Sequence, residues 1–344
     1  MEAYVEVSGL EKTYPGGFFG SPVQALRGIS FAVRPGELMG LLGPNGAGKT
    51  TTVKILSGLV VPTAGKASLL GAPAGEAAAR AQLGYLPERA LWPDHLTGIE
   101  CLEREGKLFD LPRAERRRRI DRDVGRVRLE VARRKVKTYS KGERARLGLA
   151  LALLPDPKVL LLDEPTDGLD PLGRREVRDL LVELKKEGRA ILLNSHLLSE
   201  AELCCDHVAI LARGAVVAAG RTEELLSTGG KEFVLKIVPP AKDDDVAALA
   251  TVARGVKVVG DELHVEVGDE AEIDKVVDLA RSRLLSIREL RAKRATLEQY
   301  FLRAVETGAA PPPREAGGRL GGGAPHPNPP PASRGEGVMP RPTP

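Results

Sequence analysis

The chain has 344 residues, of which 42% are hydrophobic and 28% are charged, a composition typical of a soluble globular protein. Its 51 basic and 47 acidic residues give a formal net charge of +4, which is too balanced to favour a nucleic-acid-binding protein. No apolar run approaches the roughly 18 residues that a membrane span requires, and the acidic N-terminus does not resemble a secretory signal. We therefore expect a cytoplasmic protein whose three cysteines, Cys101, Cys204 and Cys205, are reduced.

Two kinds of strand are predicted in the first part of the chain. Alternating apolar residues at Val5 and Val7 and at 29–33 are typical of half-buried antiparallel strands. Continuous apolar runs, typical of fully buried parallel strands, occur at Leu38–Leu42, Val159–Leu162, Ala190–Leu193 and Val208–Leu211. Helical patterns separate several of these runs. The sequence therefore predicts an α/β core with a parallel sheet, which binds ligands at the carboxyl ends of its strands.

Three further regions follow from composition. Residues of about 89–154 are predicted to form a helical subdomain of the first domain, 1–227, and we interpret the arginine-rich run at 113–119 as a solvated helix face rather than a phosphate or lipid patch. A βαββαβ order at 231–306 predicts a small ferredoxin-like α+β domain, closed by a helix that carries Leu297, Tyr300 and Phe301. From Gly308 onward, 11 of 37 residues are proline and 8 are glycine, which predicts a disordered tail at 308–344.

The most specific chemical motif is Gly43–Thr50, which fits the phosphate-binding pattern G-x-x-x-x-G-K-[ST]. It follows a buried strand and precedes a helical pattern, which is the context that the motif requires. Glycines let backbone amides close on phosphate oxygens, and the following helix presents its positive N-terminal end. Lys49 is predicted to reach the β- and γ-phosphates, and the Thr50 hydroxyl to bind Mg²⁺.

Two adjacent carboxylates, Asp163 and Glu164, follow the buried run Val159–Leu162. We expect Asp163 to hold Mg²⁺ through its water shell and Glu164 to polarise a water for in-line attack on the γ-phosphate. Taken alone, the pair fits a helix N-cap or a surface acid pair equally well. The phosphate-binding loop elsewhere in the chain favours the catalytic interpretation.

At this point the motifs together resemble the ATP-binding cassette (ABC) ATPases. Tyr139–Glu143 resembles the family's signature sequence, 168–170 its D-loop and 194–196 its switch-histidine motif, and Tyr14 matches the aromatic residue that stacks on adenine. The resemblance covers about residues 3–225. LTG at 96–98 and LEQYF at 297–301 look most like the cytosolic subunits of type-2 exporters, including the drug-resistance branch.

The resemblance implies a P-loop NTPase core with an antiparallel β subdomain and a helical subdomain, and a set of site residues. The implied nucleotide contacts are Tyr14, Gly43, Pro44, Asn45, Gly46, Ala47, Gly48, Lys49, Thr50, Thr51, Ser140, Lys141, Gly142, Glu143 and Asp170. The implied catalytic residues are Glu164 and His196, and the implied Mg²⁺ ligands are Thr50, Glu88 and Asp163. The implied cofactors are ATP and Mg²⁺.

The family resemblance also implies partners. Two copies would pack head to tail, so that ATP lies between the phosphate loop of one copy and the signature of the other, and its hydrolysis would release them. The homodimer would drive a separate integral membrane permease from the cytoplasmic face of the membrane, with no nucleic acid involved. A soluble ABC ATPase acting on DNA or ribosomes is the alternative. A regulator that binds nucleotide without hydrolysis is disfavoured by the intact Lys49, Asp163, Glu164 and His196.

Two residues depart from the family pattern: Glu88 and Glu143 each stand where many members have glutamine. Glu88 retains oxygen ligands for a hard cation, so we expect only a modest effect on hydrolysis. Glu143 is expected to act more on the domain surface than on the phosphate. Leu91, Trp92 and Leu96 are candidates for a groove that receives the permease, with ordinary packing of the helical subdomain as the equally weighted alternative.

Overall fold

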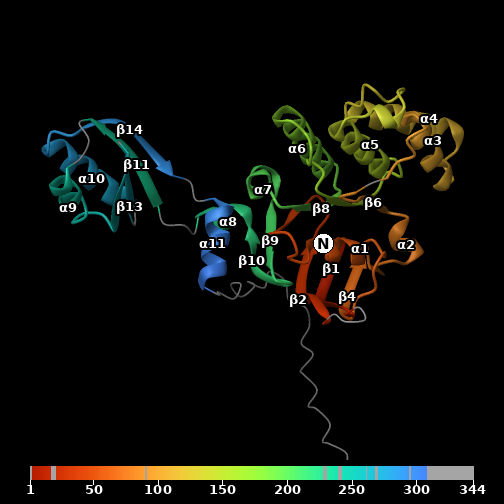
Figure 1. The fold of residues 1–344 in the computed structure, drawn as a ribbon, viewed down its shortest axis with the longest axis horizontal. Helices are drawn as coiled ribbons and strands as arrows, with labels where there is room; N and C mark the ends of the chain where they lie inside the picture. The colour runs from red at the N-terminus through yellow and green to blue at the C-terminus, as the bar shows by residue number, and fades with distance from the viewer. Residues whose placement is uncertain are drawn as a thin grey trace, which may run out of the picture. The chain divides into compact units, whose positions relative to one another are not determined.

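The computed structural model describes residues 2–16, 21–89, 91–227, 231–238, 242–260, 262–267, 270–293 and 296–307 (Figure 1). The tail predicted from Gly308 lies outside these described residues. Mixed α/β architecture with several sheets confirms the predicted fold class. Within the described residues, no helix combines the length and apolar character needed to cross a bilayer.

A six-stranded sheet forms the centre of the first domain, in the order β10–β9–β3–β8–β7–β6. Its strands are β3 (Leu38–Leu42), β6 (Leu83–Leu86), β7 (Val159–Asp163), β8 (Ala190–Ser195), β9 (His207–Ala212) and β10 (Ala215–Arg221). Five strands run parallel and β10 pairs antiparallel at the edge. Every residue of β3, β7 and β8 is buried, which explains their uninterrupted apolar runs; the polar residues of β7 and β8 stand at the carboxyl ends. The four predicted parallel strands are confirmed.

A second sheet, β2–β1–β4–β5, is antiparallel throughout. It comprises β1 (Val5–Tyr14), β2 (Val23–Val33), β4 (Ala64–Leu69) and β5 (Ala72–Pro73). Val5 and Val7 are buried while Glu6 between them is exposed, as the alternating pattern predicts. Helix α1 (Lys49–Leu56) shares one hydrophobic cluster with both sheets, and the short α2 (Ala77–Arg80) adds to the same cluster.

The predicted helical region contains α3 (Gly98–Leu108), α4 (Arg113–Arg126), the 3₁₀ turn η1 (Val136–Thr138) and α5 (Lys141–Leu153), and Figure 1 shows α3, α4 and α5 grouped together. A capping box at Thr97, reciprocated by Glu100, starts α3. Trp92 and Leu96 are partly buried and pack against the main core. Leu91 is 95% exposed and is the member of the candidate groove that remains free at the surface.

Three more helices complete the first domain: α6 (Pro171–Lys186), α7 (Leu198–Cys204) and α8 (Thr222–Ser227). Pro171 occupies the first helical position of α6 and Asp170 is its N-cap, with a side-chain oxygen accepting from the Gly173 amide at 2.8 Å. Four apolar residues of α6 are buried in the main core, namely Val177, Leu180, Leu181 and Leu184. This helix is therefore fixed to the sheet.

The C-terminal elements form a separate small core. They are β11 (Lys231–Val238), α9 (Asp243–Leu249), β12 (Gly255–Val259), β13 (Glu262–Val267), α10 (Glu270–Ser282) and β14 (Ser286–Lys293). The antiparallel strand order β12–β13–β11–β14 is the order of a ferredoxin-like βαββαβ unit. Buried apolar residues of both helices, such as Leu249 and Val276, share one cluster with the sheet.

The last helix, α11 (Leu297–Thr307), departs from its predicted position. We expected it to close the C-terminal domain, but its apolar residues Leu297, Tyr300 and Phe301 pack with the core of the first domain. The amide of Leu297 donates to the carboxylate of Glu202 on α7 at 2.5 Å. The prediction was wrong because α9 and α10 already cover the small C-terminal core, while the surface of α7, α8 and β10 offers α11 an apolar partner.

Candidate functional site

The phosphate-binding loop connects buried strand β3 to helix α1 and depends on two glycines. Gly43 has φ +140°, and a Cβ there would lie 2.1 Å from the Leu211 carbonyl oxygen. Gly48 has φ +106°, and a Cβ there would lie 2.6 Å from the Ala25 carbonyl oxygen. Neither position tolerates a side chain, because both the backbone conformation and the neighbouring backbone exclude it. The loop conformation therefore requires the glycines of the motif.

The start of α1 is open to an anion. Its N-cap residue is Gly48, which has no side chain to satisfy the first amides of the helix. Lys49 as a residue is only 5% exposed. Its Nζ donates hydrogen bonds to the carbonyl oxygens of Gly43 at 2.7 Å and Pro44 at 3.2 Å. Burial lowers the pKa of Lys49, against the opposing effect of nearby carboxylates, Glu164 foremost. Free amides beside a buried amine are the elements of a polyphosphate site.

Asp163 ends β7 and is the most perturbed acid of the site. The Asn194 amide donates to its Oδ1, whereas Asp163 Oδ2 and Asn194 Oδ1 have no hydrogen-bond partner among the described residues. Burial, followed by the charges of Glu88 and Glu164, raises the pKa of Asp163 to about 6, although the hydrogen bond from Asn194 acts in the opposite direction. An unsatisfied buried carboxylate oxygen among further acids fits a hard divalent cation.

Glu164 and His196 lie in direct contact. The Glu164 backbone has φ +54°, and its amide donates to the Asn194 carbonyl oxygen at 3.0 Å, which turns the chain sharply at the end of β7. Its Oε1 accepts from the His196 amide at 3.0 Å and lies 2.8 Å from His196 Nδ1. The Glu164 side chain is 12% exposed and the His196 side chain 46%. The structure thus brings together the two residues predicted to be catalytic.

The signature residues form a separate helix start. Ser140 is the N-cap of α5, where its hydroxyl accepts from the Glu143 amide at 3.2 Å and its own amide donates to Glu143 Oε2 at 2.7 Å. Lys141 pairs with Asp167, near the D-loop, at 2.7 Å. Within the described part of the chain, no hydrogen bond or ion pair joins Ser140–Glu143 to the loop at Gly43–Thr50. The structure therefore does not bring these two predicted halves together in one chain.

Glu88 and Tyr14 flank the site in different ways. Glu88 is exposed after β6, and its charge acts on the pKa of both Lys49 and Asp163, so it lies in the electrostatic surroundings of the site. Tyr14 is at the end of β1, with Lys12 Nζ 5.1 Å from the centre of its ring. Lys12 thus lies over one face of the Tyr14 ring, and Tyr14 as a residue is half-buried.

Sequence reasoning named Asn194 and Glu143 but missed the contacts by which they organise the site. Asn194 holds Asp163, and the parallel register that pairs these two residues across β7 and β8 would have indicated the contact. Glu143 closes a capping box with Ser140, which the S-x-x-E spacing would have indicated. The departure from glutamine at position 143 therefore retains a side-chain acceptor for the Ser140 amide.

The site combines a loop whose conformation requires glycines, a buried lysine and carboxylates at neighbouring strand ends. These features define a P-loop nucleotide-binding domain. The ABC transporter family model matches residues 26–167. An ABC transporter ATP-binding protein of Synechocystis, itself uncharacterised, is 39% identical over 88% of this chain and 84% of its own length. The chain belongs to the family of ABC transporter ATP-binding proteins.

Further similarities agree with this assignment. The daunorubicin resistance ATP-binding protein DrrA3 of Streptomyces coeruleorubidus is 35% identical over 87% of this chain and 94% of its own length. A solved structure of an ATP-binding subunit of an ABC transporter superposes with a TM-score of 0.58 at 33% identity, over 65% of this chain and 92% of that one. The chain is an ATPase of the ABC family, and ATP is its ligand.

Proposed function

We propose that the chain is the ATP-hydrolysing subunit of an exporter, in which two copies close head to tail around ATP and drive a separate membrane permease. The observation that carries the proposal is the separation of two phosphate-binding features. The loop before α1 and the start of α5 both present helix N-termini, yet no bond joins them within the described residues of one chain. A second copy supplies the missing half of each site.

The roles of the loop and signature residues follow from this arrangement. Backbone amides of residues 43–51 surround the phosphates, Lys49 contacts the β- and γ-phosphates, and Tyr14 stacks on adenine. From the other copy, Ser140 and Gly142 contact the γ-phosphate with the positive end of α5 behind them. Lys141, Glu143 and Asp170 shape that edge through the ion pair, capping box and N-cap already described.

The carboxylate cluster fits Mg²⁺. Thr50, Asp163 and Glu88 are oxygen donors, and the unpaired Asp163 Oδ2 is the observation that supports a cation there. When bound, the ion supplies positive charge that stabilises the phosphate oxygens during transfer. Glu88 in place of glutamine is compatible with this role because a carboxylate is also a hard ligand.

Glu164 and His196 carry out the hydrolytic step. The Glu164 carboxylate orients and deprotonates the water that attacks the γ-phosphate. His196 holds that carboxylate through its backbone amide and Nδ1, and its remaining ring nitrogen is available for the γ-phosphate. The left-handed backbone at Glu164 fixes the direction of its side chain.

Export and a permease partner are supported by the relatives. DrrA3 and an M. tuberculosis homologue, 39% identical over 72% of this chain, are both named as drug-resistance ATP-binding proteins. We propose that this chain likewise acts peripherally at the cytoplasmic face of the membrane through its permease. Leu91, exposed beside the partly buried Trp92, is the apolar residue of the helical region best placed to contact it.

The test is co-purification of the Glu164→Gln variant from its own cells in ATP, after gentle membrane solubilisation. The variant is expected to hold the closed dimer, because nucleotide binds while the attacking water is not activated. Recovery of an integral membrane protein with ATP, and its loss in the Lys49→Ala variant, supports the proposal. Recovery of ribosomes or DNA-repair proteins instead would replace export by a soluble function.

A further inference from the structure

Helix α6 presents a line of carboxylates to the helical region. Glu176, Glu183 and Glu187 are spaced by seven and four residues, which places them on one face of α6 and its C-cap. Three arginines of the helical region pair with them. We call this set the ionic seam: Glu176, Glu183 and Glu187 with Arg126, Arg128 and Arg146.

Arg146 is the central residue of the ionic seam. It lies on α5, six residues after Ser140, with its side chain 15% exposed. Its Nη2 contacts Glu176 Oε2 at 2.7 Å, and its Nη1 donates to the Val127 carbonyl oxygen at 2.7 Å. Arg128 pairs with the same Glu176. One guanidinium therefore joins the signature helix, the end of α4 and α6.

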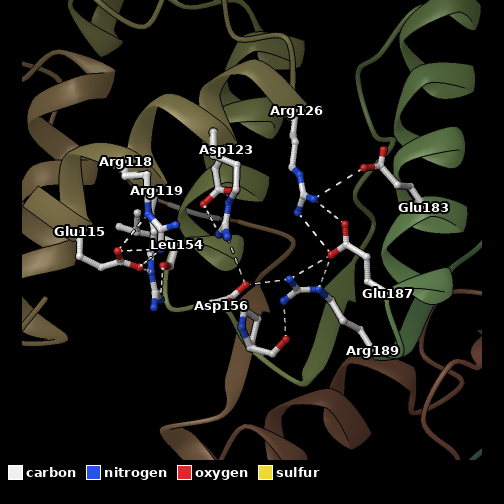
Figure 2. Close-up of polar contacts among 12 residues, drawn as sticks. Glu115, Arg118, Arg119, Asp123, Arg126, Leu154, Asp156, Glu183, Glu187 and Arg189 are labelled. Carbon is white, nitrogen blue, oxygen red and sulfur yellow. Dashed lines mark hydrogen bonds and ion pairs between the residues drawn. The ribbon is translucent and has the colours of Figure 1, made fainter.

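The other end of the ionic seam continues into a wider ionic network (Figure 2). Arg126 lies 2.5 Å from Glu187 and 3.6 Å from Glu183, and Glu187 also pairs with Arg189 at 3.2 Å. Arg189 contacts Asp156 at 2.8 Å, in the turn that leads from α5 into β7. The network thus holds the turn that connects the signature helix α5 to β7, the strand that ends in Asp163.

The two sides of the ionic seam carry different parts of the reaction. The apolar face of α6 is buried in the core, and α6 begins seven residues after Glu164. Helix α5 carries Ser140 at its start. Packing alone permits helices to slide. Arg126 instead contacts both carboxylate oxygens of Glu187, and the partly buried Arg146 directs one nitrogen to Glu176 and another to the Val127 carbonyl oxygen. Such two-point contacts fix direction as well as distance.

We propose that the ionic seam is a positioning element for hydrolysis: it fixes Ser140 relative to Glu164 of the same chain. This inference rests on the proposed head-to-tail dimer, because there the signature of one copy meets ATP bound by the other. With two copies related by symmetry, an error in the position of α5 displaces the signature in both sites. A displacement of about 1 Å can cost about a hundredfold in rate.

The test compares the Glu176→Gln and Arg146→Gln variants with Arg146→Lys and with the control Arg117→Gln. Arg117 is on α4 and is exposed, with no ion pair within the described residues. Glu176→Gln keeps the shape of the side chain and one acceptor oxygen, so we expect it to fold. It therefore tests the inference even if Arg146→Gln does not fold. Turnover is measured for each, together with equilibrium binding of a fluorescent ATP analogue to dilute protein.

We expect kcat to fall at least about tenfold for Glu176→Gln and Arg146→Gln, while analogue binding stays within about twofold. Arg146→Lys is expected to recover part of the rate, and Arg117→Gln to match the wild type. Unchanged kcat in Glu176→Gln would overturn the inference. A parallel loss of analogue binding, or an equal loss in the control, would also overturn it, because general loosening would then explain the result.

Association of the Glu164→Gln protein with ATP separates this inference from the proposed function. If that parent dimerises and addition of Glu176→Gln weakens its association at least about tenfold, the ionic seam positions the signature. If both proteins associate equally, the positioning role fails and the dimer stands. If the parent does not associate, the dimer fails and the inference falls with it.

Discussion

The raised pKa of Asp163 predicts that this residue lowers the stability of the nucleotide-free fold. The shift from 3.8 to about 6 comes first from burial and then from the charges of Glu88 and Glu164. This rise in pKa corresponds to about 3 kcal/mol of lost folding free energy, because each pKa unit is worth about 1.4 kcal/mol. Because the folded state holds the proton more tightly, stability falls as pH rises from about 4 to about 6, and the full penalty remains above that range.

The Asp163→Asn variant removes this penalty. The new amide keeps an acceptor oxygen for the Asn194 side chain and carries no charge. Without Mg²⁺ and nucleotide, at pH 7.5, we expect the variant to gain up to about 3 kcal/mol of stability, or about 6–12 °C in Tm for a domain of this size. Its ATPase activity is expected to be lost, since the charge that destabilises the empty fold is the charge that Mg²⁺ requires.

Thermal unfolding in EDTA between pH 5 and pH 8 checks this reasoning, with the exposed Asp121→Asn as a matched control. The gap in Tm between Asp163→Asn and wild type should widen up to about pH 6 and then level off. Asp121→Asn should stay within about 1 °C of wild type throughout. A variant at position 163 that is no more stable than wild type at pH 7.5 would refute the argument that the buried charge is uncompensated.

Three further outcomes follow from the site. Glu88→Gln should change turnover by less than about threefold in a steady-state assay, because either side chain offers oxygen to the cation; complete loss would contradict this. Gly48→Ala should abolish binding of a fluorescent ATP analogue and lower Tm, since its Cβ would lie 2.6 Å from the Ala25 carbonyl oxygen; normal binding would show that the loop tolerates a side chain. Deletion of 308–344 should leave ATPase activity within about twofold, and a larger loss would refute the predicted disorder of the tail.

Much of the central sheet could be predicted because its signal is local. Burial on both faces demands continuous apolar residues, and β3, β7, β8 and β9 each contain an uninterrupted apolar run of four or five residues. The phosphate loop is equally local, since the pattern, the strand and the helix are adjacent in sequence. The placement of α11 was not predictable in this way. Its amphipathic pattern fits any apolar surface, and its partner α7 is about 95 residues away.

The site itself shows the same limit. The adjacent pair Asp163 and Glu164 was identified with the correct strand, but the partner that holds Asp163 lies 31 residues further on. His196 was implied as a catalytic residue of the switch-histidine motif, and in the structure its amide donates to Glu164, 32 residues earlier in the chain. Sequence spacing identifies which residues carry the chemistry, whereas strand register decides which of them touch.

The arginine-rich helix α4 shows why a run of charge is ambiguous in sequence. We interpreted 113–119 as a solvated face, and Arg117 and Arg118 are indeed exposed. Arg116 is only 9% exposed, with its Nε 2.5 Å from Glu103, and Arg119 donates to the Leu154 carbonyl oxygen, so the interpretation was wrong for these two. Some of the acceptors are distant in sequence: Arg116 pairs with Glu103, 13 residues away, and Arg119 donates to the Leu154 carbonyl oxygen, 35 residues away. The buried arginines of α4 also contact residues outside the helix, so mutating its buried face should cost more stability than mutating its exposed face.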